Sequence, residues 1–176
     1  MRLSRILCDQ RGVAAVEFAL IAPVMILTYC GLAELSIAMM AERRAAHSAS
    51  VVADLVAQSG TISTTDLTDI YSVGDAIMAP FPASTLKMRI TSVTADSNAV
   101  PKVSWSQGHG LTALTKTSTV SGFPANLLTA GDSVIQADVQ YTFTSPLQYV
   151  IPAPLVFKDT YYLRPRQGGA VICGTC

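Results

Sequence analysis

The feature that most constrains this chain is a long apolar run near its N-terminus. Residues 13–41 contain just two charged side chains, Glu17 and Glu34, and the 16 residues from Phe18 to Ala33 carry no charge. With the preceding turn, this segment would span about 30 Å as a helix, at about 1.5 Å per residue, which is the thickness of a bilayer's hydrocarbon core. The sequence therefore predicts a helix that can cross a membrane.

The remainder of the chain has the composition of an ordinary globular domain. The 176 residues fit one domain plus an anchor, and their formal net charge is zero. The longest basic tract is Arg43-Arg44, so the electrostatic footprint of a nucleic-acid-binding protein is missing. We expect no nucleic-acid partner.

Charges on either side of the apolar run predict its orientation. Arg2, Arg5 and Arg11 stand against a single Asp9 before the run, and positively charged flanks stay on the cytoplasmic side of a membrane. Arg43 and Arg44, which follow the run, reduce this difference in charge between its two sides. The prediction is a cytoplasmic N-terminus and an extracytoplasmic C-terminal part.

Glu17 is unusual because an acidic side chain inside a membrane helix costs about 2.5–3.5 kcal/mol at the centre and less near an interface. One interpretation places its carboxylate at headgroup depth, where the positive end of the helix dipole favours it. The other interpretation depends on its neighbours. These are Gly12, five residues earlier, and Phe18, immediately after it.

Gly12, Glu17 and Phe18 make this region resemble type IV prepilins of the tight-adherence (Flp) subclass. The string at residues 16–23, together with Glu34 further along the helix, resembles the TadE-like branch of that subclass. The resemblance covers about residues 10–45. A basic leader before the motif and an apolar helix after it supply the expected context.

The resemblance implies a processing site and an assembly role. A prepilin peptidase would cut after Gly12, and the new amine of Val13 would be neutralised by Glu17 of a neighbouring subunit, with Phe18 as a packing residue. It further implies a non-enzymatic minor pseudopilin or pilus-assembly component in the bacterial inner membrane, with a periplasmic domain and no cofactor. Its partners would be prepilin peptidase, other pilins or pseudopilins and the tight-adherence machinery.

Three alternatives compete with this interpretation. A secretory signal peptide would be cut near Gly31-Leu32-Ala33, but Glu17 and Pro23 interrupt its core, and the apolar run exceeds the usual length. An uncleaved anchor is the second alternative, and with it an extracytoplasmic binding domain unrelated to pili. A periplasmic thiol-disulfide enzyme is the third, and it depends on the terminal Cys173 and Cys176.

The helix is expected to continue well past the membrane, to about Gln58. Pro23 lacks a backbone donor and predicts a kink, and Gly60 predicts a left-handed cap at the far end. A three-four spacing predicts the packed seam, which faces either the chain's own domain or a partner helix. Its members are Leu32, Leu35, Met39, Ala46, Ala49, Ala53 and Val56, with Glu42 at the one polar position.

The C-terminal part is predicted to be α+β and pilin-like. A helix is expected from Thr64 until Pro80, and then period-two alternation predicts strands around residues 86–90, 103–105, 134–143 and 158–164. These would form an antiparallel sheet of about four strands. The connection from Gly108 to Gly131 is either a functional surface loop or an unrecognised strand.

No catalytic or metal-binding constellation is expected. His47 and His109 are the only histidines, and they lie far apart in the sequence. Cys173 and Cys176 have redox spacing but close the chain, so a disulfide is favoured over partner-linked thiols. Arg164 and Arg166 are either a basic patch facing a partner or solvated side chains.

The predicted organisation therefore has three parts. Residues 1–12 form a basic leader peptide, residues 13–60 a long helix with a transmembrane N-terminal half, and residues 61–176 an extracytoplasmic α+β domain.

Overall fold

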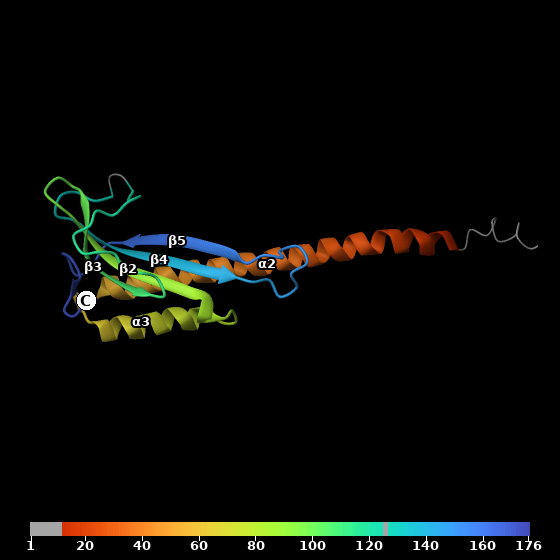
Figure 1. Ribbon diagram of the computed structural model, residues 1–176, viewed down its shortest axis with the longest axis horizontal. Helices are drawn as coiled ribbons and strands as arrows, with labels where there is room; N and C mark the ends of the chain where they lie inside the picture. Colours follow the sequence, from red (N-terminus) through yellow and green to blue (C-terminus); the bar gives the residue numbers. More distant parts are fainter. Residues whose placement is uncertain (1–11, 125–126) are drawn as a thin grey trace, which may run out of the picture.

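A long helix carries an antiparallel sheet and a second helix on its C-terminal half (Figure 1). The computed structural model describes residues 12–124 and 127–176, so the predicted leader lies outside them except for Gly12. The elements, in chain order, are α2 (Val13–Gln58), β1 (Thr61–Ile62), α3 (Thr64–Ile77), the short 3-10 helix η2 (Ala83–Thr85), β2 (Leu86–Ala95), β3 (Pro101–His109), β4 (Ser133–Phe143), β5 (Leu155–Leu163) and β6 (Ile172–Cys173). The predicted α+β class and antiparallel sheet are confirmed.

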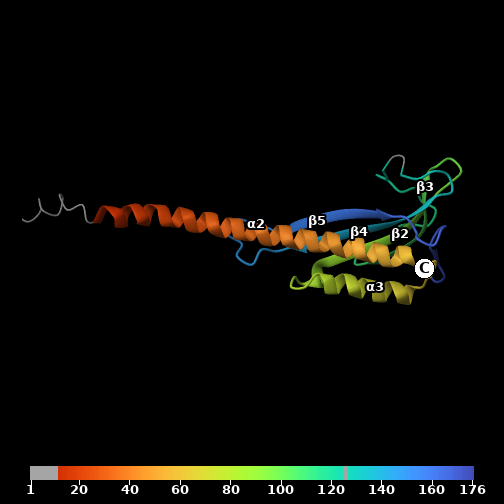
Figure 2. The same ribbon diagram turned by 180° about the vertical axis from the view of Figure 1, so that it is seen from behind.

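Helix α2 has two halves with different surroundings. Its 46 residues extend about 70 Å at about 1.5 Å per residue. Figures 1 and 2 show the N-terminal half projecting beyond the sheet, whereas the C-terminal half lies against β4, β5 and α3.

The buried face of α2 differs from the predicted seam. Ala49, Ala53 and Val56 are buried as expected, but Leu32, Leu35 and Met39 are about half exposed or more. The buried positions of the first packed turns are instead Glu34, Ala38, Ala41 and Ala45. Of the two predicted partners of the seam, the chain's own domain contacts mainly small residues of α2, which allow the sheet to approach the helix closely.

Helix α2 ends without a left-handed cap, so that prediction is wrong. Ser59 is extended, with φ −89° and ψ 138°. The carbonyl of Gly60 accepts a hydrogen bond from the Ile172 N–H at 3.1 Å. The chain therefore passes directly into a two-stranded parallel ladder, in which β1 pairs with β6.

Helix α3 begins where its sequence predicts. The Ser63 hydroxyl accepts the N–H of Asp66, and the Asp66 carboxylate accepts the N–H of Ser63, which is a capping box. Hydrogen bonds from Ser63 hold the pKa of Asp66 below its ordinary value. Leu67, Tyr71 and Met78 are buried against α2 and the sheet.

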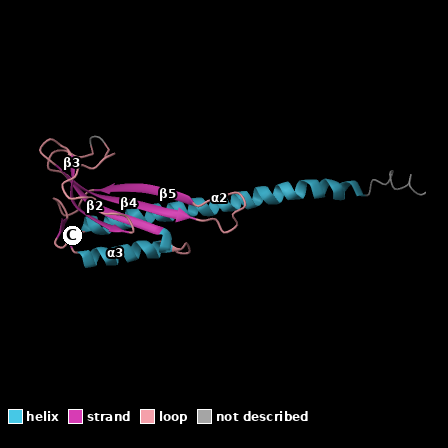
Figure 3. Ribbon diagram, viewed as in Figure 1, coloured by secondary structure: helices cyan, strands magenta, loops and turns pink. Residues whose placement is uncertain are grey.

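The main sheet has the strand order β3-β2-β4-β5, and all its neighbours are antiparallel (Figure 3). Strands β2 and β4 pair with Ile90 opposite Ala137. Period-two alternation turns one face of these strands toward the helices. The side chains that it buries there are Leu86, Met88, Ile90, Ile135, Ala137, Val139, Tyr141 and Phe143.

A bulge in β3 places Val103 and Trp105, which were predicted to share a face, on opposite faces of the sheet. Ser92 pairs with Trp105 and Val93 pairs with Val103, so Ser104 is an extra residue in its strand. Trp105 therefore joins the core under the helices, whereas Val103 joins a second cluster on the other face. The alternation that placed both residues on one face was wrong at this point.

The long connection after β3 covers that second face. Val120 and Leu128 are buried there with Val93, Val103 and Val134. In the described part of this connection, residues 110–124 and 127–132, the sole strand-like pairings are isolated bridges such as Lys102 with Thr119. The segment is thus a packed loop that shields the sheet.

Candidate functional site: the projecting half of helix α2 and its junction with the domain

The projecting half of α2 presents apolar side chains to its surroundings on all sides. In the most apolar stretch of 18 residues of α2, no residue is buried, and the helix is long and apolar enough to cross a membrane. At least half of each of the following side chains is exposed: Val16, Phe18, Leu20, Ile21, Val24, Met25, Ile26, Leu27 and Tyr29. A soluble helix would bury one such stripe, so this surface requires an apolar environment.

The four residues of the predicted processing site lie at the tip of this half. Gly12 immediately precedes the helix, and Val13 is the first helical residue. Glu17 and Phe18 follow in the second turn, and both are exposed. No described residue packs over this segment, so the Glu17 carboxylate is open to groups outside the described chain.

Pro23 lies within the helix and does not end it. Helix α2 continues from Val13 to Gln58 with Pro23 inside it. In the next turn, the Thr28 hydroxyl donates to the carbonyl of Val24 at 2.8 Å, which engages one backbone acceptor beyond its helical bond. Helix α2 therefore continues through the proline, and the kink expected there stays a prediction.

Glu34 is the residue of this region whose role the sequence did not predict. Its side chain is fully buried. Oε1 accepts the N–H of Tyr149 at 2.9 Å, and Oε2 accepts the N–H groups of Val150 at 3.1 Å and Ile151 at 2.8 Å. Three backbone donors from one short segment therefore satisfy a carboxylate on the helix.

The donors belong to the connection between β4 and β5, residues 144–154, which we name the collar loop. It meets α2 where the helix leaves the domain. A Cβ atom added to Gly31 would lie 3.1 Å from Cγ2 of Val150. The loop therefore packs closely on the helix at this glycine, which has no side chain. Glycine at this position and glutamate one turn later together hold the loop against the helix.

A signal for this contact exists in the sequence, but it is incomplete. A charged residue inside an apolar helix needs a partner, and that argument applies to Glu34 as much as to Glu17. The partners are backbone groups, which carry no side-chain signature, and they lie more than a hundred positions away. The sequence alone therefore could not identify them.

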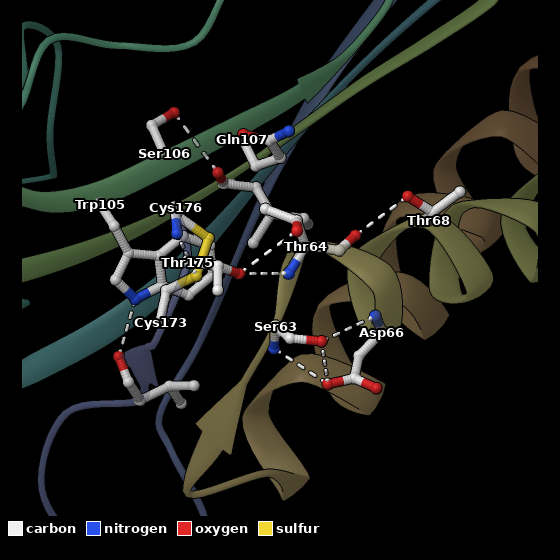
Figure 4. The surroundings of a disulfide bond; sticks show 12 residues. Ser63, Thr64, Asp66, Thr68, Trp105, Ser106, Gln107, Cys173, Thr175 and Cys176 are labelled. Atoms are coloured by element: carbon white, nitrogen blue, oxygen red, sulfur yellow. Dashed lines mark hydrogen bonds between the residues drawn. A yellow bond between two sulfur atoms is a disulfide. The ribbon is translucent and has the colours of Figure 1, made fainter.

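The terminal cysteines lie at the opposite end of the domain, where they form a disulfide (Figure 4). Nearby, the Thr175 hydroxyl accepts the N–H of Thr64 at 3.0 Å, at the start of α3. The indole of Trp105 donates to the carbonyl of Val171 at 2.7 Å. The disulfide thus closes a C-terminal segment that is tied to α3 and to the sheet.

The other polar residues singled out from the sequence are not brought together. His109 stacks on Tyr71 and lies 3.6 Å from Asp75, whereas His47 lies on α2. Arg166 pairs with Asp54 on α2, and Arg164 donates to the carbonyl of Leu127 at 3.2 Å. Both arginines therefore contact their own domain.

An exposed apolar helix that continues into an α+β domain defines a class of proteins in which one N-terminal helix is both anchor and scaffold. Residues 12–54 match the family model described as TadE-like protein, which confirms the resemblance carried by Gly12, Glu17 and Phe18. Apart from Gly12, this match lies within α2; it covers about a quarter of the chain and points to an association with the tight-adherence pilus. Neither a curated protein nor a solved structure matches the chain.

Proposed function

We propose that this chain is a non-enzymatic minor pseudopilin of a tight-adherence pilus. In this proposal it is made as a precursor, cut after Gly12 by prepilin peptidase, and held in the bacterial inner membrane by residues 13–33. The domain then lies in the periplasm. The observation that carries the proposal is the position of an exposed apolar helix directly after Gly12, within the TadE-like match.

The assembly step in this proposal depends on Glu17. Its carboxylate is exposed on an apolar helix surface, and a charge in that environment is stabilised by pairing with an opposite charge. The α-amine that cleavage creates on Val13 is such a charge. Glu34 does not compete for this role because its carboxylate is already engaged by three N–H groups.

The first test is the N-terminus of the mature protein, isolated from membranes of cells that contain the pilus machinery. Mass spectrometry should find Val13 as the first residue, and Gly12→Leu should leave the precursor uncut. An intact Met1 in the wild-type protein would instead support an uncleaved anchor. A start at Glu34 would indicate a signal peptide.

The second test uses a zero-length carbodiimide cross-linker, which joins a carboxylate to an amine only when the two are in contact. We expect a cross-link between Glu17 of one subunit and the amine of Val13 of another pilin or pseudopilin. Glu17→Gln should abolish the cross-link and entry into pilus complexes while leaving cleavage intact. Glu42→Gln, which alters an exposed glutamate outside the apolar half of the same helix, is the matched control.

If Glu17→Gln entered complexes as efficiently as Glu42→Gln, the charge-pairing role would be wrong. The N-terminal analysis tests the processing step separately.

A further inference from the structure

The collar loop has an exposed tip that is unusually apolar. Leu147 is 49% exposed, Tyr149 73% and Val150 57%. No charged residue occurs from Val139 to Phe157, a stretch that contains the whole loop. A loop facing water would ordinarily present polar side chains, so this tip requires another explanation.

The tip lies at a defined level of helix α2. Val150 packs at Gly31 and the loop backbone binds Glu34, so the tip lies against the helix at the end of residues 13–33. Those residues extend about 31 Å at about 1.5 Å each, close to the roughly 30 Å of a hydrocarbon core. When α2 spans a bilayer, the tip therefore lies at its outer interface.

The loop backbone also suits an environment with little water. Exposed N–H groups are costly near lipid, but those of Tyr149, Val150 and Ile151 are all taken by Glu34. The same bonds enclose the Glu34 charge, which would otherwise face the lipid. Tyrosine is enriched at membrane interfaces because its ring is apolar and its hydroxyl is polar.

A second uncharged segment lies at the same end of the domain. Residues 76–86, which connect α3 to β2, carry no charge. Pro80, Phe81 and Pro82 line an apolar pocket with Ile37 of α2 and Pro146 of the collar loop. Two uncharged segments, the collar loop and residues 76–86, therefore lie at the end of the domain from which the helix projects.

We propose that the collar loop is a second membrane contact, in which Leu147, Tyr149 and Val150 enter the outer interfacial layer and seat the domain on the bilayer. This inference rests on the membrane-spanning role of α2 in the proposed function. Its occupant is the lipid surface itself, because the tip continues the exposed apolar surface of the helix. The result would be a domain held at fixed height and tilt.

The test is depth-dependent fluorescence quenching of the full chain in nanodiscs that contain brominated phosphatidylcholine. The natural sequence has one tryptophan, Trp105, which is buried in the domain core and supplies an internal reference. Tyr149→Trp reports on the collar loop, Leu27→Trp on the span, and Asn98→Trp on the turn at the opposite end of the sheet. Leu147→Trp is a second collar probe in case Tyr149→Trp does not fold.

We expect the added emission of Tyr149→Trp to be lost with lipids brominated near the carbonyl end of the chain, and less with lipids brominated near the methyl end. The added emission of Asn98→Trp should be unaffected by either lipid. Quenching of Leu27→Trp but not of either collar probe would overturn the inference. Absence of quenching for Leu27→Trp would overturn the membrane span itself, and the collar contact with it.

Discussion

Oε2 of Glu34 lies 2.8 Å from the backbone nitrogen of Ile151, a residue 117 positions later in the chain. With the bonds to Tyr149 and Val150, this contact fastens the collar loop to α2 at the point where the helix leaves the domain. The domain is therefore joined to the projecting half of α2 by a lateral attachment as well as by the peptide chain.

Removing the charge of Glu34 should release the collar loop. In Glu34→Gln one carboxylate oxygen becomes an NH₂ group, which faces backbone donors and cannot accept from them. We expect hydrogen exchange at Tyr149, Val150 and Ile151 to become much faster, while exchange in β2 and β4 changes little. Glu42→Gln should leave the collar amides protected, and equal exchange in the two variants would contradict the anchoring role.

The Tyr71 hydroxyl links α3 to two strands. It donates to the carbonyl of Gln107 at 2.7 Å and accepts the N–H of Ile90 at 3.2 Å. Tyr71→Phe removes this partner from both backbone groups, of which the Ile90 N–H is buried, and should lower the free energy of unfolding by about 1–3 kcal/mol. Denaturant titration in detergent measures this loss, and Tyr149→Phe, at an exposed ring, should change stability by less than about 0.5 kcal/mol.

Alkaline pH should weaken the domain through the same hydroxyl. Burial raises the pKa of Tyr71 above its ordinary value of 10.0. The folded state thus favours the neutral phenol, and the stability this provides is complete below the unfolded pKa and lost as pH rises through the folded one. The free energy of unfolding should fall above about pH 10, with a shallower slope in Tyr71→Phe, and identical slopes would contradict the assignment.

Arg89 and Asp138 form a cross-strand pair between β2 and β4. Nε and Nη2 of Arg89 lie 2.9 Å and 2.7 Å from Oδ2 of Asp138, and the Thr160 hydroxyl donates to Oδ1 at 2.9 Å. Because the Asp138 side chain is 13% exposed, Asp138→Ala should cost about 1–3 kcal/mol. Lys102→Ala, at an exposed pair with Asp96, should lower the free energy of unfolding by less than about 1 kcal/mol. An equal loss of stability in Asp138→Ala and Lys102→Ala would contradict this expectation.

The terminal disulfide is expected to stabilise the domain modestly. It joins cysteines three positions apart, and closing so short a loop contributes about 2 kcal/mol in the chain-entropy account. Cys173→Ser should lower the unfolding temperature by about as much as a reducing agent lowers that of the wild type. A disulfide-exchange activity that Cys173→Ser abolishes without loss of stability would instead support the thiol-disulfide alternative.

Much of the fold could be predicted because its signals are local. The polar residues from Thr64 to Asp66 predict the start of α3, and alternation along residues 134–143 predicts a strand that is buried on one face. The length of α2 follows from its apolar and alanine-rich sequence. In each case the deciding interactions lie within one or two turns of the residues that show them.

The errors arise where a distant backbone decides the structure. The bulge at Ser104 has no sequence signature, yet it separates Val103 from Trp105. The β1 and β6 pairing replaces the left-handed cap expected at Gly60. Glu34 is buried because the collar loop supplies N–H groups, and this rotates the packed face of α2 away from Leu32, Leu35 and Met39.

The continuity of α2 has a mechanical consequence. Helix α2 is unbroken from Val13 to Gln58, and the Glu34 bonds to the collar loop add to the packing that holds the domain against the helix. We therefore expect the projecting half of α2 and the domain to turn together. In the proposed function, a rotation imposed on the projecting half, for example when a neighbouring subunit engages Glu17, would be carried along the helix to the sheet.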